Sequence, residues 1–369
     1  MNENKEKRDS WWNMELECKP DFIKAMQRVY AWLEGEVIDR PPVRFILHNA
    51  EFNIAELHQR EWKSLKEKWF DVEYQVENFI RSLHNKRFTA ETFPVFWPNL
   101  GPNLYSAFYG AHLEFGEITS WAEPCLQDLQ QVAQLKLDKE CTYFRKIVEL
   151  TDYALEKCEG KFMVGYTDLH PGVDCVAAWR NPQALCMDFC DEPEAVKDTV
   201  DKAMASFQEV YDFFDTKLKS KKQLSVTWMG IPSFGKMHIP SCDFASMISP
   251  DHFDAYCMPA LRKEVKPMTH NIFHLDGKGV ARHLENILDV PEIQAIQWVQ
   301  GEGDDIGILQ WMPLIKRIRK AGKSVVVNLR KWELEDFMQE IDREGIFLCI
   351  DADSVEEQQT LLKRIEKWD

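Results

Sequence analysis

Short apolar runs, each followed by a segment with helical periodicity, repeat along most of this chain. Runs that are hydrophobic at nearly every position indicate strands covered on both faces, as in parallel sheets. We predict eight strands, at residues 43–47, 93–97, 162–166, 224–228, 272–275, 295–299, 324–328 and 346–350.

Helical patterns separate the apolar runs. We predict helices at about 54–83, 123–158, 194–218, 250–264, 280–287, 309–321, 334–343 and 354–367, and an earlier one at 21–34. Eight strands, each followed by a helix, describe an α/β fold of the (β/α)₈ TIM barrel type. Residues 1–40 would form an N-terminal tail and helix, and residues 41–369 the barrel. A doubly wound sheet is the alternative, but no glycine-rich loop follows the first strand.

Charge and composition narrow the class of partner. The chain has 45 Lys and Arg against 61 Asp and Glu, which gives a formal net charge of −16. Nucleic acid and anionic membranes both require basic surface and are excluded as expected partners. The amino terminus is polar and no apolar run is long enough to span a bilayer, so we expect a cytoplasmic protein. Its ten cysteines lack a CxxC pair and are typical of reduced thiols.

A barrel places its active site at the carboxyl ends of the strands. Titratable and aromatic side chains are dense at the predicted ends, and the ones we select are His48, Trp97, Asp168, His170, Trp228, His274, Asp276, Trp298, Glu302 and Cys349. His274 and Asp276 are two residues apart and therefore project to the same side of an extended chain. An ordinary alternative is that His274 is structural and that Asp276 begins a turn with Gly277.

Two kinds of chemistry fit these residues. In the first, His274 and Cys349, with Asp276 or Cys242, hold a zinc ion, which accepts nitrogen, sulfur and oxygen ligands. In the second, no metal is needed, and Asp168, His170 and Asp276 act as acid and base groups. His170 can equally be a structural residue in the turn before Pro171.

Aromatic residues cluster near the same strand ends. Trp97, Trp121, Trp228 and Trp298, with Tyr105, would surround a small substrate. Aromatic faces beside carboxylates attract cations, above all quaternary ammonium groups. The competing interpretation is that these tryptophans fill the core.

Three segments of the chain resemble the uroporphyrinogen decarboxylase superfamily. They are YTDLHPGVDCVAAWRNPQALCMDF from residue 166, ISPDHFDAYCMPALRKEV from residue 248, and FHLDGKGVARHLENILDVPEIQAIQWVQGEGD from residue 273. The most specific mark is the pattern of Ser249, Pro250, Phe253 and Pro259. The resemblance extends from about Pro41 to the carboxyl terminus and implies the same barrel.

This superfamily has two broad branches. True uroporphyrinogen decarboxylases carry an arginine motif after the first strand, whereas here Arg44 is followed by no arginine before Arg60. The second branch contains zinc-dependent methyltransferases with a His-x-Cys motif after the fifth strand and a distant second cysteine. This chain offers His274-Leu275-Asp276 and Cys349, so aspartate replaces the first cysteine. A carboxylate in place of a thiolate makes a harder metal site.

The resemblance implies a methyltransferase that moves a methyl group between a small methylated substrate and a corrinoid carried by a separate protein. Zinc would be held by His274 and Cys349, with Asp276 or Glu302 as a further ligand, Cys242 in reserve and Asp243 orienting a histidine. His48 and Glu302 would join the aromatic residues around the substrate. The alternatives are a metal-free decarboxylase or lyase and a non-catalytic binding barrel. A homodimer is the expected assembly because homodimers are common among barrel enzymes.

Overall fold

The computed structural model describes residues 11–47, 60–83, 88–301 and 303–368. The strands in these ranges are β1 (Val43–Leu47), β2 (Val95–Phe96), β3 (His112–Phe115), β4 (Ser120–Glu123), β5 (Met163–Val164), β6 (Met237–His238), β7 (His270–Asp276), β8 (Ala295–Val299), β9 (Ser324–Leu329) and β10 (Ile346–Ala352). The α-helices are α2 (Phe22–Leu33), α3 (Leu65–Phe70), α4 (Val72–Leu83), α5 (Leu104–Ala107), α6 (Thr142–Lys157), α7 (Gly172–Arg180), α8 (Pro182–Asp191), α9 (Pro193–Met204), α10 (Phe207–Ser220), α11 (Pro250–His252), α12 (Met258–Val265), α13 (Gly277–Ala281), α14 (Leu284–Leu288), α15 (Met312–Lys320), α16 (Leu334–Glu340) and α17 (Val355–Ile365).

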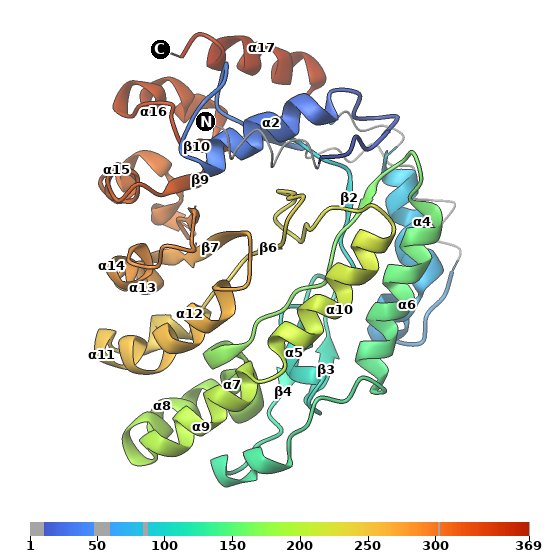
Figure 1. The fold of residues 1–369 in the computed structure, drawn as a ribbon, viewed down its shortest axis with the longest axis vertical. Helices are drawn as coiled ribbons and strands as arrows, with labels where there is room; N and C mark the ends of the chain where they lie inside the picture. The colour runs from blue at the N-terminus through green and yellow to red at the C-terminus, as the bar shows by residue number, and fades with distance from the viewer. Residues whose placement is uncertain (1–10, 48–59, 84–87, 302, 369) are drawn as a thin grey trace.

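The main sheet has six parallel strands in the order β1-β10-β9-β8-β7-β6, and β2 and β5 form a separate parallel pair. The sheet is curled, and helices surround the strands on the outside (Figure 1). Strands β3 and β4 make an antiparallel hairpin. No helix in the described ranges combines the length and the apolar character that crossing a membrane requires. The structure thus confirms an α/β fold with a curled parallel sheet, and closure into eight strands stays a prediction.

The predicted strand at 224–228 is not formed; the structure has only an isolated bridge between Ser225 and Ser233. The backbone N–H and C=O of Ser225 both pair with Ser233, and its Oγ accepts the backbone N–H of Met237 at 2.9 Å. A serine hydroxyl that bonds to a neighbouring backbone competes with regular strand pairing. The edge of the sheet next to β7 is instead the unpredicted strand β6.

Several of the predicted helices differ from the observed ones; those expected at 54–83 and 280–287, for example, are each divided in two among the described residues. The helix expected at 123–158 begins only at Thr142, where the thiol of Cys141 accepts the N–H of Phe144. The polar hairpin β3–β4 and a 3₁₀ turn precede it. The helix expected at 194–218 is two helices, α9 and α10.

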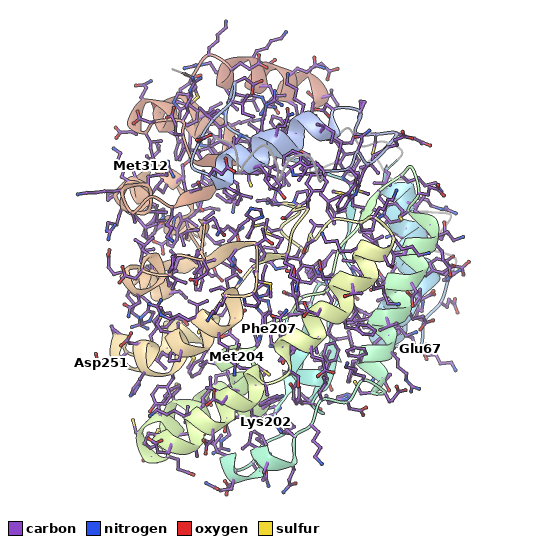
Figure 2. All side chains as sticks on the ribbon, viewed as in Figure 1. Glu67, Lys202, Met204, Phe207, Asp251 and Met312 are labelled. Atoms are coloured by element: carbon purple, nitrogen blue, oxygen red, sulfur yellow. The ribbon has the colours of Figure 1, made fainter. Side chains whose placement is uncertain are left out.

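The two faces of the curled sheet contribute to two separate hydrophobic cores. Phe273, Leu275, Ile296 and Trp298 belong to the outer core between strands and helices. Their neighbours along the strands, which point the other way, build the inner core; its strand members include Met163, Met237, Ile272, Ala295, Val326, Phe347 and Cys349. Figure 2 shows side chains filling the space between the helices and the strands.

Helix α2 fills one end of the curled sheet. Its apolar face, with Phe22, Met26, Val29 and Trp32, is part of the inner core. The indole N–H of Trp32 donates to the carbonyl of Gly345, just before β10, at 3.1 Å. The predicted N-terminal extension is therefore built into the fold, and it closes the end of the sheet where the strands begin.

A buried ionic network fastens α2 to the strands. The carboxylate of Glu91, which has no exposed surface, accepts from Arg28 at 3.1 Å, from Arg40 at 2.7 Å and from the N–H of Val43 at 2.8 Å. Asp39 pairs with Arg28 on its outer side, and the hydrogen bond from Arg28 lowers the pKa of Asp39 to about 2. Two arginines thus share one fully buried anion.

We predict that Glu91→Gln destabilises the protein by about 3 kcal/mol, because it leaves two buried guanidinium groups without their shared charge. Urea unfolding followed by circular dichroism measures the loss. The exposed Glu36, substituted to Gln, is the matched control, with an expected change below about 0.5 kcal/mol. Equal effects of the two substitutions would contradict the role of Glu91.

Candidate metal and substrate site

Polar residues replace apolar ones on the inner face of the sheet toward the carboxyl ends of the strands. On β7 the inner positions change from Ile272 in the inner core to His274 and then Asp276. On β8 the inner residue Gln297 lies beside His274 in the strand register. The change creates a polar layer above the hydrophobic layer that α2 covers.

The imidazole of His274 is held in one orientation. Its Nδ1 lies 2.7 Å from Oε1 of Gln297, which is 5% exposed. A carbonyl oxygen only accepts, so Nδ1 donates a proton to this hydrogen bond and Nε2 takes no part in it. Trp228 contacts the same imidazole edge to face, with ring centres 5.1 Å apart. His274 therefore presents an oriented nitrogen donor.

Ligand atoms of Asp243, His274 and Asp276 lie within 4.8 Å of one another. Asp243 reaches this point on the loop that follows β6, which runs beside β7: the N–H of His274 donates to the carbonyl of Pro240 at 2.9 Å. Loss of hydration and the nearby Asp174 carboxylate raise the pKa of Asp243 to about 6. Carboxylates crowded beside an imidazole nitrogen are a set of donors that a divalent metal ion accepts.

The described residues contain one other group of this kind, His112, Glu114 and Glu123 on the β3–β4 hairpin. All three are exposed, whereas His274 in the first group is half-buried beside the exposed Asp243 and Asp276, and Nδ1 of His112 is already hydrogen-bonded to Tyr143 at 2.9 Å. This hairpin is separate from the main sheet. The group on the β6–β7 side is therefore the stronger candidate.

Asp168 and His170 belong to a hydrogen-bonded chain that reaches the same loop. Nε2 of His170 lies 2.8 Å from Oδ1 of Asp168, and Nδ1 lies 2.9 Å from Oγ of Ser241. The hydroxyl of Ser241 donates in turn to Asp174 at 3.4 Å. Both nitrogens of His170 are thus engaged as donors, an arrangement that only the imidazolium satisfies.

Neighbouring carboxylates keep the imidazole of His170 protonated. Burial alone would lower the pKa of His170, but the charge and hydrogen bond of Asp168, with Asp174 and Asp243 nearby, raise it to about 10. His170 is therefore a fixed cation at neutral pH. Sequence reasoning found Asp168 and His170 but missed Ser241 and Asp174, although Asp174 lies four residues after His170 in a segment that carries the family resemblance.

The two predicted cysteine ligands do not join the group of Asp243, His274 and Asp276. Cys349 is 1% exposed in the inner core; burial raises the pKa of its thiol, and contact with Arg44 opposes that rise. Cys242 is buried with its sulfur 3.6 Å from that of Cys257, and the interaction with Cys257, followed by burial, raises its pKa well above the usual value. Among the described residues, neither thiol joins a group of three ligand atoms within 4.8 Å.

The predicted substrate-binding aromatics separate into several places. Trp228 lies beside His274, and the half-buried Trp97 lines a recess with Trp69 and Asn99. Trp121 is exposed on β4. Trp298 packs against Trp311 in the outer core, with ring centres 4.9 Å apart.

Tyr105 is fully buried, and its hydroxyl donates to the carbonyl of Ala203 at 2.9 Å. Residues 48 and 302, where His48 and Glu302 were predicted to bind substrate, lie outside the described residues. The structure therefore brings together Trp228, His274 and Asp276 with Asp243, which was predicted to orient a histidine, and it adds Gln297.

The raised pKa of His170 predicts a pH dependence of stability. Below pH 6.5 the imidazole is protonated in both folded and unfolded chains; between pH 6.5 and about pH 10 only the folded chain keeps the proton. The stabilisation from His170 should therefore be complete below pH 6.5 and disappear as pH rises toward 10. Urea unfolding of the metal-free wild type and of His170→Gln across this range measures it. A stability difference that stays constant with pH would refute the shifted pKa.

Comparison with known proteins finds a likeness in fold. No protein-family model matches the chain, and no curated protein matches it in sequence. Among solved structures, a methyltransferase from Methanosarcina mazei is similar with a TM-score of 0.57 and 12% sequence identity; the match covers 93% of this chain and 98% of that one. At this identity the likeness establishes a shared fold over nearly the whole length of both chains.

Proposed function

We propose that this chain is a methyltransferase that uses a divalent metal ion, zinc by preference, to take a methyl group from a small methylated amine and pass it to a separate corrinoid protein. The observation that carries the proposal is the grouping of Asp243, His274 and Asp276 within 4.8 Å. It lies at the end of the sheet where barrel enzymes carry their chemistry. The shared fold with a methyltransferase supports methyl transfer over other reactions of such folds.

The residues present fit a metal ion. Nε2 of His274 and one oxygen from each of Asp243 and Asp276 supply three donors and leave room for a further ligand, as catalytic zinc requires. When bound, the ion would act as a Lewis acid that polarises a lone-pair group of the substrate or stabilises a nucleophile. Gln297 orients His274 by accepting a hydrogen bond from its Nδ1–H, a type of support commonly needed by metal-binding histidines. The set contains no thiolate, so it favours oxygen and nitrogen groups over thiols.

The surroundings of the metal group favour a cationic substrate. Asp243 and Asp276 place carboxylates there, and the indole of Trp228 lies beside His274. Aromatic faces and carboxylates together attract methylated ammonium groups. Transfer of the methyl group breaks a carbon–nitrogen bond whose electron pair stays on nitrogen, so a neutral amine leaves. The corrinoid partner accepts the methyl group.

The metal-free decarboxylase or lyase is the second candidate class, and the geometry of His170 makes it less suited. Asp168 and Ser241 occupy both ring nitrogens of His170, and its pKa is raised to about 10. A general base near neutral pH needs a free lone pair. A non-catalytic binding protein would hold a methylated amine and release it unchanged.

We predict that the purified protein binds one equivalent of Zn²⁺ and that His274→Ala weakens the binding by roughly 100-fold or more, because a ligand is lost. Cys349→Ser should leave the affinity within about threefold of wild type, since Cys349 lies in the inner core. Competition titration with a chromophoric chelator measures both variants. Undiminished binding in His274→Ala, or its loss in Cys349→Ser, would overturn this ligand assignment.

The activity itself is tested with the zinc-loaded protein, free reduced cobalamin as a stand-in for the corrinoid partner, and a panel of methylated amines. Mass spectrometry of the demethylated product is the readout. Turnover that is lost in both His274→Ala and Asp276→Ala supports the proposal. Release of carbon dioxide from a carboxylated substrate, or binding of an amine without turnover, would favour the decarboxylase or the binding protein instead.

A further inference from the structure

The loop that carries Asp243 begins a short helix without a cap of its own. The 3₁₀ turn Asp243–Met247 follows Cys242, and the side chain of Cys242 makes no capping hydrogen bond. The first N–H groups of any helix lack partners within it and need acceptors from elsewhere. What satisfies them here decides where the carboxylate of Asp243 is held.

Asp174 provides the missing cap from a different helix. It lies in the first turn of α7, and its Oδ2 accepts the N–H of Asp243 at 3.0 Å while its Oδ1 accepts the N–H of Phe244 at 2.9 Å. Hydrogen bonds from backbone N–H groups to a carboxylate are charge-assisted and stronger than neutral ones. Both oxygens of Asp174 are therefore engaged with the backbone of the loop.

Asp174 is in turn connected to the chain that runs through His170. The hydroxyl of Ser241 donates to Oδ2 of Asp174 at 3.4 Å and accepts from His170 at 2.9 Å. Ser241 forms a bridge with His274 on β7. The result is one continuous set of contacts from Asp168, after β5, through α7 and the β6 loop to the strand that carries His274.

We propose that Asp174 is a positioning residue for the metal site: it holds the loop at 241–244 so that the carboxylate of Asp243 faces His274 and Asp276. This inference rests on the proposed function, because it takes Asp243 as a ligand. Asp174 is not one of the residues whose ligand atoms lie within 4.8 Å of one another, and its oxygens bond to the N–H groups of Asp243 and Phe244. Removal of Asp174 should weaken metal binding although every ligand remains.

The test compares Asp174→Asn and Asp174→Ala with wild type, using Co²⁺ as a spectroscopic probe. Asparagine keeps one carbonyl oxygen and can accept one of the two N–H groups, whereas alanine accepts neither. We expect Co²⁺ affinity to fall roughly 10-fold in Asp174→Asn and roughly 100-fold in Asp174→Ala, the range for residues that support metal ligands. The visible Co²⁺ spectrum should shift in Asp174→Ala. The exposed Asp198 of α9, substituted to Ala, is the matched control.

A readout without metal separates this inference from the proposed function. In the metal-free protein, amide hydrogen exchange of the peptide that covers 241–247 should speed up in Asp174→Ala and stay as in wild type in Asp198→Ala. Wild-type affinity and spectrum in both Asp174 variants, or unchanged exchange, would overturn the positioning role. Equal losses of Co²⁺ affinity in Asp174→Asn and Asp174→Ala would assign the effect to the charge of Asp174 alone and would also overturn the positioning role.

If wild type binds no Co²⁺, the proposed function fails, and the exchange experiment still decides whether Asp174 holds the loop. If Asp174→Ala does not fold, Ser241→Ala provides a second variant, because it removes the link between His170 and Asp174. The expected result is then a smaller loss of Co²⁺ affinity, about threefold to 10-fold. No change in Ser241→Ala or in Asp174→Asn would reject the proposal.

Discussion

A curled parallel sheet has an interior that must be filled by its own side chains, because empty space in a core forfeits dispersion and hydrophobic energy. In this chain the two ends of that interior are filled by different kinds of side chain. Helix α2 and the apolar residues around it occupy the end where the strands begin, and the buried charges of Arg28, Arg40 and Glu91 hold that helix in place. The other end is therefore the one where polar side chains can remain without disrupting the core.

The polar end is stable only because its charges are balanced against one another. Three carboxylates, those of Asp168, Asp174 and Asp243, approach a region that also contains His274 and Asp276. Like charges at such distances raise one another's pKa. The imidazolium of His170 relieves part of this repulsion from within the chain, and a divalent cation between Asp243, His274 and Asp276 would relieve more. The place where a cation would relieve the repulsion is therefore also the place of the proposed metal site.

How much the sequence predicts differs between strands and loops. Continuous apolar runs identify β1, β7, β8, β9 and β10, because strands buried on both faces tolerate little else. The strand at 224–228 was wrong because the backbone of Ser225 pairs with Ser233 in an isolated bridge, a local pairing that no hydrophobic pattern reveals. Trp298 shows a related limit. Alternation along β8 places Trp298 and Gln297 on opposite faces of the sheet, but the sequence does not say which of the two faces the interior. Asp243 and Asp174 meet through tertiary contacts between segments about 70 residues apart, which sequence spacing cannot reveal.

The location of the cysteines gives a physical reason for an aspartate, rather than a cysteine, at position 276. A thiolate site needs sulfur atoms beside the metal, and among the described residues neither Cys242 nor Cys349 joins the group of ligand atoms around His274. Cys349 lies among apolar residues and Cys242 beside another thiol. Carboxylates are ionised at neutral pH at far lower cost. With Asp276 on β7 and Asp243 held by α7, the site would exchange soft donors for hard ones, and its preference would move from a thiol toward an amine or oxygen group.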